Sequence, residues 1–155
     1  MPGLFYEDLA EGRAWTTAAR ALGEAEVMAF AGLSGDHTYL HTDALAAARG
    51  PFGERVAHGL LGLSVLSGLM MEMDFLAGTV EAFLGLAWRF TGPIRFGDRV
   101  RGEIAVQSRR LSRKGQGLVT FALKMKNQKD ETVQEGEFTL MVRRRGETEQ
   151  SKMSF

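Results

Sequence analysis

Hydrophobic and polar positions follow a helical spacing in the first half of the chain. After a short strand expected around residues 13–20, the spacing predicts a helix over residues 24–34, whose shared face holds Val27, Phe30, Ala31 and Ser34. Gly35 can end this helix, because a residue without a Cβ readily takes the left-handed conformation. Asp43 is placed to cap a shorter helix over residues 44–48.

The segment from Gly59 to Met73 carries apolar residues on nearly every side of a helix. A helix that is apolar all round is expected to be buried all round. We therefore predict one long central helix here. Its glycines, Gly62 and Gly68, are expected to let strands pack closely on it.

After the central helix the spacing changes to alternation, which predicts four half-buried strands over residues 80–90, 99–107, 119–126 and 137–143. Turn signals separate them, as in Gly92-Pro93 and Gly97-Asp98. One buried helix followed by a long antiparallel sheet predicts an α+β fold in which the sheet wraps around the helix. This is the hot-dog arrangement.

The chain has 155 residues, which fit one domain. We assign that domain to residues 1–143 and expect the polar, unpatterned residues 144–155 to form a disordered tail. The 19 basic and 19 acidic residues cancel, so a nucleic-acid partner is not expected. The first residues lack the pattern of a signal peptide, and the longest apolar stretch is shorter than the about 20 residues that cross a bilayer. We expect a cytoplasmic protein without membrane contact.

All three histidines, His37, His41 and His58, lie in one short part of the chain, beside Asp36 and Gly59. An imidazole titrates near neutrality, so it can take a proton and return it. Asp36 and His41 are expected on a loop between two helices, where a carboxylate could orient the imidazole or hold a water molecule. The alternative is that Asp36 only shapes a turn.

Gly59 is predicted to open the central helix, where the first N–H groups have no partner within the helix. Such a donor suits a carbonyl oxygen that gains negative charge during a reaction. His58 could bond the loop or take part in the chemistry. Ser64 and Ser67 are expected to bond carbonyls one turn back, and a site role for either stays open.

Other kinds of site fit less well. His37 and His41 have the spacing of zinc ligands on a helix, but their neighbours favour a loop and no third ligand is evident, so no metal is expected. The absence of cysteine excludes thiolate ligands, thiolate nucleophiles and disulfides. A serine triad is not expected either, because the chain has no Gly-x-Ser-x-Gly elbow.

Two segments carry a resemblance to a known family. Residues 30–36 (Phe-Ala-Gly-Leu-Ser-Gly-Asp) with residues 40–43 (Leu-His-Thr-Asp) resemble the hydratase motif of MaoC-like dehydratases, the (R)-specific enoyl-CoA hydratases. Residues 52–61 with Ser67-Gly68-Leu69 resemble that family's stretch into its central helix. The likeness covers residues 5–143.

The resemblance implies a hot-dog fold that acts on acyl-CoA thioesters. By position, Asp36 and His41 would be the catalytic pair, Gly59 would donate its amide to the thioester oxygen, and Ser67 would match a supporting serine. The family usually has Asn-Pro where this chain has Thr38-Tyr39, so Tyr39 could narrow the pocket or offer its hydroxyl.

We therefore expect a hydro-lyase of fatty acid metabolism that interconverts trans-2-enoyl-CoA and (R)-3-hydroxyacyl-CoA. It would need no cofactor beyond the coenzyme A of its substrate, and it would form a homodimer or larger homo-oligomer. One alternative is an acyl-CoA thioesterase with Glu72 as its carboxylate. The other is a non-catalytic acyl-CoA-binding protein, for which the altered residues 38–39 would be the sign.

Overall fold

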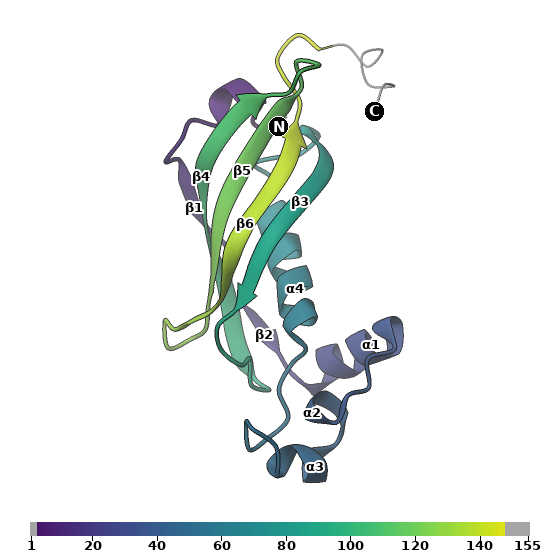
Figure 1. The fold of residues 1–155 in the computed structure, drawn as a ribbon. Coiled ribbons are helices and arrows are strands. Elements are labelled where there is room, and N and C mark those ends of the chain that lie inside the picture. Colours follow the sequence, from purple (N-terminus) through teal and green to yellow (C-terminus); the bar gives the residue numbers. More distant parts are fainter. Residues whose placement is uncertain (1–2, 148–155) are drawn as a thin grey trace.

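A computed structural model describes residues 3–147, and these residues form one antiparallel sheet with a long helix against it (Figure 1). After the short 3-10 helix Tyr6–Asp8, the elements are β1 (Ala14–Thr16), β2 (Arg20–Leu22), α1 (Glu24–Ser34), α2 (Tyr39–Thr42), α3 (Ala44–Ala48), α4 (Gly59–Glu72), β3 (Val80–Phe90), β4 (Asp98–Leu111), β5 (Gly117–Lys126) and β6 (Thr132–Val142).

The strand order in the sheet is β1-β4-β5-β6-β3, and β2 pairs with another part of β4. The long strands curve around α4, so the predicted α+β hot-dog fold is confirmed (Figure 1). The single strand expected over residues 13–20 is instead two strands, because Thr17 leaves the ladder and its hydroxyl accepts a hydrogen bond from Gly102 N–H. Among the described helices, none has both the length and the apolar character of a membrane span.

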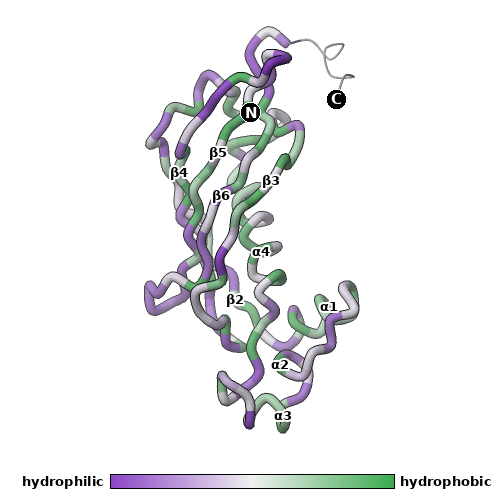
Figure 2. The backbone as a smooth tube through the Cα atoms, in the orientation of Figure 1, coloured by the Kyte–Doolittle hydropathy of each residue, from purple (hydrophilic) through white to green (hydrophobic). Residues whose placement is uncertain are grey.

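The core lies between α4 and the inner face of the sheet. Leu66 and Met70 of α4 are buried there with Phe121 of β5 and Phe138 of β6. Figure 2 shows the resulting alternation of hydrophilic and hydrophobic residues along the strands. Close approach is possible because Gly102 of β4 has no side chain, and Leu66 occupies the space that a Cβ would take there.

The glycines of α4 differ in role. Gly62 lies against Ile94, where an added Cβ would approach the Ile94 Cδ1 to 2.6 Å, so its expected packing role is confirmed. Gly68 faces open space, with nothing within 4 Å of an added Cβ, so the same expectation for Gly68 is wrong.

Two apolar segments are less buried than their patterns predict. In β3, Phe83, Leu86 and Phe90 are each about half exposed, and in α4 Leu60 is 59% exposed. The physical reason is position: β3 forms one edge of the sheet, with β6 on one side and no described strand on the other. The prediction that α4 is buried all round is wrong, because the sheet covers this helix on one side (Figure 1). Periodicity reveals the two faces of a strand, but it does not reveal that a strand lies at an edge.

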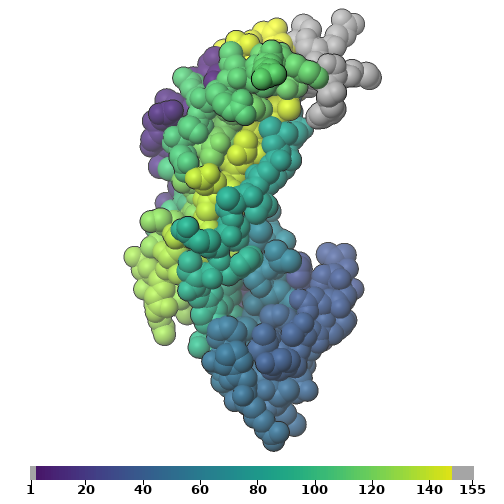
Figure 3. Space-filling model, viewed as in Figure 1, coloured from purple at the N-terminus to yellow at the C-terminus, as the bar shows by residue number. Residues whose placement is uncertain are grey.

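Helices α1, α2 and α3 form a lobe at one end of the sheet (Figure 3). The helix ends in this lobe are determined by the local sequence, as predicted. Gly35 has φ of 80° and ends α1, donating its N–H to the Ala31 carbonyl over 2.9 Å. The Asp43 carboxylate caps α3 by accepting from Ala46 N–H over 2.9 Å.

The predicted tail lies mostly outside the described residues. Its first part is placed: the side chain of Arg144 pairs with Glu7, and that of Arg145 pairs with Asp8. These contacts attach residues 144 and 145 to the beginning of the chain. The domain boundary at residue 143 stays a prediction.

Candidate active site

Asp36 lies just after the C-terminal end of α1 and is exposed. Its backbone N–H donates to the Ser34 hydroxyl over 3.1 Å, and its Oδ1 accepts from the hydroxyl of Thr38 over 2.6 Å. That second bond is the main reason that the pKa of Asp36 is below its usual value, and the Thr38 N–H adds to the effect. Asp36 is therefore a carboxylate at neutral pH.

His41 lies on α2, not on the loop that the sequence predicted. A helix of four residues is too short for its periodicity to be recognised. The His41 Nδ1 is 2.7 Å from the carbonyl oxygen of Val56. A carbonyl only accepts, so Nδ1 carries the hydrogen, and Nε2 holds the lone pair of the neutral ring.

His58 is 2% exposed and precedes the first residue of α4. Its Nε2 is 2.9 Å from the backbone carbonyl oxygen of Asp36, to which it must donate. Its ring stacks on that of His41, with centroids 3.9 Å apart, and also contacts the Phe30 ring. The Nδ1 of His58 is buried and has no hydrogen-bond partner among the described residues. His58 thus connects the backbone of Asp36 to the ring of His41.

The predicted acid and base do converge. One ligand-type atom from each of Asp36, His41 and His58 lies within 4.8 Å of the other two. These distances alone would admit a metal ion, with His58 as the third ligand that the sequence pattern did not indicate. Because His41 Nδ1 and His58 Nε2 donate to backbone carbonyls, the ring nitrogens left to accept a proton or to bind an ion are His41 Nε2 and the buried His58 Nδ1.

A hollow of about 370 Å³ adjoins this group. His41 and Gly59 line it, together with Leu40, Phe52, Val56, Ala57, Phe90, Thr91, Gly92, Pro93, Ile94 and Gln134. Gly59 opens α4 as predicted, and a Cβ there would lie 2.7 Å from two atoms of the Phe90 ring. Asp36 is not among the residues that line the hollow, whereas His41 is.

Gln134 is a residue that the sequence reasoning missed. It is 1% exposed, its Nε2 donates to the Gly59 carbonyl over 3.0 Å, and its Oε1 accepts from Trp88 Nε1 over 2.9 Å. A signal was present, because the alternation of Phe138, Leu140 and Val142 extended back along β6 places residue 134 on the inner face. Gln134 fixes the first turn of α4 against the sheet.

Other candidates lie apart from this group. The Ser67 hydroxyl donates to the Ser64 carbonyl, and Ser64 donates to Leu60, as predicted for serines in a helix. Ser67 is about 12 Å along the helix axis from Gly59, at 1.5 Å per residue. Glu72 is at the far end of α4, about 20 Å from Gly59 by the same rise, and it pairs with Arg20 over 2.6 Å.

Tyr39 is the first residue of α2, a position at which proline is common. Its side chain is 45% exposed and lies beside Gly50, where an added Cβ would be 3.3 Å from the ring. Tyr39 is not among the residues that line the hollow. His37 is also exposed, and none of the described hydrogen bonds involves its ring.

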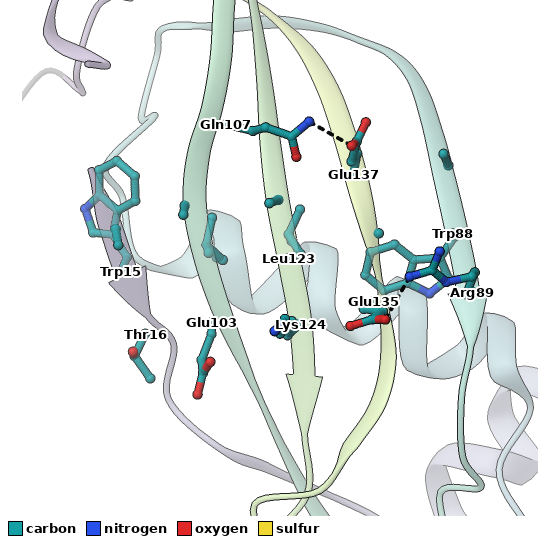
Figure 4. A pocket seen from close by; sticks show the side chains of 16 residues that line it. Trp15, Thr16, Trp88, Arg89, Glu103, Gln107, Leu123, Lys124, Glu135 and Glu137 are labelled. Carbon is teal, nitrogen blue, oxygen red and sulfur yellow. Dashed lines mark hydrogen bonds and ion pairs between the residues drawn. The ribbon is translucent and has the colours of Figure 1, made fainter. Parts of the chain in front are cut away.

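A second hollow, of about 870 Å³, lies across the sheet strands (Figure 4). One row of directly paired residues crosses it, in the order Thr16, Glu103, Lys124, Glu135 and Arg89. Opposite charges thus alternate along the row, and Arg89 pairs with Glu135 over 2.8 Å. This pattern is typical of a solvated sheet face. None of Asp36, His41 and His58 lines this second hollow.

Known proteins resemble this chain in both sequence and fold. The model of the MaoC like domain matches residues 8–128. Protein MaoC of Klebsiella aerogenes is 39% identical over 98 residues, 63% of this chain but only 29% of that protein, so the chain spans less than a third of this relative. An (R)-specific enoyl-CoA hydratase of Rhodospirillum rubrum is 30% identical over 142 residues, which cover 92% of this chain and 94% of that protein.

Solved structures of known proteins are also similar to this chain. The MaoC-like dehydratase from Rhodospirillum rubrum has a TM-score of 0.85 at 30% identity, over 94% of this chain and 100% of that one. The match to the family model covers more than half of the chain, and it includes Asp36, His41 and Gly59. The chain belongs to the MaoC-like domain family.

Proposed function

We propose that this chain is a hydro-lyase that adds water reversibly to a trans-2-enoyl-CoA and forms an (R)-3-hydroxyacyl-CoA. The observation that carries the proposal is the meeting of Asp36, His41 and His58 beside a hollow that Gly59 also lines. The names of its relatives support the substrate class: (R)-specific enoyl-CoA hydratase in Rhodospirillum rubrum and 3-hydroxyacyl-thioester dehydratase Z in Mycobacterium tuberculosis.

The chemistry needs a base, an acid and a donor for a developing negative charge. Water is poor at attacking C3 of the enoyl group unless a base removes its proton, and the pair of Asp36 and His41 would provide this, with His41 Nε2 as the atom that holds a lone pair. As C3 gains the oxygen, electrons move from the double bond toward the thioester carbonyl. The Gly59 N–H, at the positive end of α4, would stabilise that oxygen.

A proton returned to C2 from the same side completes the addition. Because acid and base lie on one side of the hollow, we expect syn addition. Hydration changes no oxidation state overall, so the reaction calls for no redox cofactor. We propose that the substrate is an acyl-CoA of the cytoplasm. A single positioned acid or base group contributes about 10²- to 10⁴-fold to the rate of such a reaction.

We further propose that the protein works as a homodimer or larger homo-oligomer. The edge strand β3 exposes Phe83, Leu86 and Phe90, and Leu60 of α4 is exposed beside Gly59, against which Phe90 packs. An apolar sheet edge continuous with an apolar helix surface is a common interface between copies of one chain. This surface adjoins the hollow, since Phe90 and Gly59 line it.

The direct test is to mix the purified protein with crotonyl-CoA and follow the loss of enoyl absorbance, together with the release of free thiol. Hydration lowers the absorbance and releases no thiol. Thiol release would indicate the thioesterase, which the position of Glu72 at the far end of α4 does not favour. Saturable binding without either change would indicate an acyl-CoA-binding protein and would overturn the proposal.

A further inference from the structure

The carboxyl group of Asp36 receives two hydrogen bonds from a single residue, Thr38. The Thr38 N–H donates to Oδ1 over 3.1 Å, and the Thr38 hydroxyl donates to the same oxygen over 2.6 Å. Both donors reach Oδ1, and the other oxygen, Oδ2, receives no hydrogen bond from the described residues. One oxygen of the acid is therefore fixed, and the second is available to water.

Thr38 is also attached to the helix that carries the base. Its carbonyl oxygen accepts from the His41 N–H over 2.9 Å and from the Thr42 hydroxyl over 3.2 Å. Thr38 is the residue just before α2, so these bonds form the start of that helix. A displacement of Thr38 would move the carboxyl group of Asp36 and the backbone of His41 together.

The same hydrogen bonds lower the pKa of the Asp36 carboxyl group. The Thr38 hydroxyl is the largest cause of the lowered pKa of Asp36, and the Thr38 N–H comes next. The titratable groups that face Asp36 are His41 on α2 and His58 before α4, and positive charge on either lowers this pKa further by a smaller amount. An aspartate carboxyl group is ionised at neutral pH at its ordinary pKa, and these bonds favour the ionised form further, so Asp36 holds no proton there that it could donate to a substrate.

We propose that Thr38 is a positioning residue that orients the Asp36 carboxylate beside the reacting water and leaves proton transfer to His41. The inference rests on the proposed function. The water proton passes to His41 Nε2 as the oxygen bonds to C3, and the same nitrogen returns a proton to C2. One water is added, and His41 ends unchanged. Asp36 supplies the negative charge that stabilises the imidazolium in between.

The resemblance described above implies asparagine at the position that Thr38 occupies in this chain. A hydroxyl group on a β-branched side chain brings its donor onto Oδ1 beside the N–H of the same residue. Replacing a residue with only a structural role would change the stability of the fold alone. A positioning residue acts on the titration of Asp36 and on kcat.

The experiment compares Thr38→Val, which is nearly isosteric but lacks the hydroxyl, with Thr38→Ser, which keeps it. Thr38→Ala is the second variant without a hydroxyl, so a folding defect peculiar to valine does not decide the result. The matched control is Thr120→Val, which removes a hydroxyl 3.3 Å from that of Thr139 on the sheet. Two quantities are measured: the ¹³C NMR titration midpoint of the Asp36 carboxyl group, and kcat with crotonyl-CoA.

We expect Thr38→Val and Thr38→Ala to raise the titration midpoint of Asp36 and to lower kcat about tenfold with little change in KM, as for loss of one hydrogen bond to a charged group. Thr38→Ser and Thr120→Val should match the wild type in both. A wild-type midpoint in Thr38→Val, or an equal loss in Thr38→Ser, would overturn the inference. If the wild type does not hydrate crotonyl-CoA, the proposed function fails, and the titration still decides whether Thr38 hydrogen-bonds the Asp36 carboxylate.

Discussion

The imidazole rings of His41 and His58 are stacked, with centroids 3.9 Å apart and planes inclined by 27°. The ring of His58 is held in place by its bond to the Asp36 carbonyl, and the ring of His41 by its bond to the Val56 carbonyl. Each ring thus fixes the orientation of the other.

Two substitutions separate these contributions of His58. His58→Phe keeps a ring for stacking but leaves the Asp36 carbonyl without its donor, and a typical hydrogen bond contributes about 0.5–1.5 kcal/mol to stability. We expect it to lower both the free energy of unfolding and kcat. His58→Gln keeps an amide donor and loses the ring, so kcat should fall with a smaller loss of stability. Denaturant unfolding and steady-state kinetics measure both.

The third histidine provides the control for His58. His37 is exposed, so His37→Ala should leave kcat and stability unchanged. If His58→Phe and His58→Gln both retain the wild-type kcat, His58 has no role in positioning the pair.

Asp36→Asn and His41→Asn test the pair itself. Asparagine at position 36 can still accept from Thr38 but carries no charge, and asparagine at position 41 retains a donor for the Val56 carbonyl but no base. Each should lower kcat by about 10²- to 10⁴-fold while thermal unfolding stays near that of the wild type. Full hydratase rates in either variant would show that another group carries out the chemistry.

Gly59→Ala tests the close approach at the start of α4. The new Cβ would lie 2.7 Å from the Phe90 ring, so the ring must move toward the hollow. We expect kcat/KM with crotonyl-CoA to fall. Phe90→Leu should restore part of it in the double variant, because the smaller side chain gives the Cβ room, and a double-mutant cycle measures this coupling. Purely additive effects would argue against the contact.

The elements that the sequence predicted well are those with strong local signals. Gly35 ends α1 and Asp43 begins α3 as expected, because a left-handed glycine and a capping carboxylate act within a few residues. The alternation in β4, β5 and β6 likewise predicted their inner faces, since one side of each strand packs on α4. Local chemistry decides such features.

The features that the sequence did not reveal depend on distant parts of the chain. His58 meets the Asp36 carbonyl 22 positions away, and Gln134 meets the Gly59 carbonyl 75 positions away. No local spacing records such a contact. The exposed side chains of β3 are a similar case, because their exposure depends on the position of the strand in the sheet and not on its hydrophobic pattern.

That exposed edge gives the last prediction. Leu86 of β3 is 51% exposed, and a charge there should oppose burial in an interface between two copies of the chain. Light scattering should report a dimer or larger oligomer for the wild type and a smaller species for Leu86→Glu. The control is Leu33→Glu on α1, which is 87% exposed but lies away from the edge, so it should keep the wild-type mass. A monomeric wild type would contradict the proposed assembly.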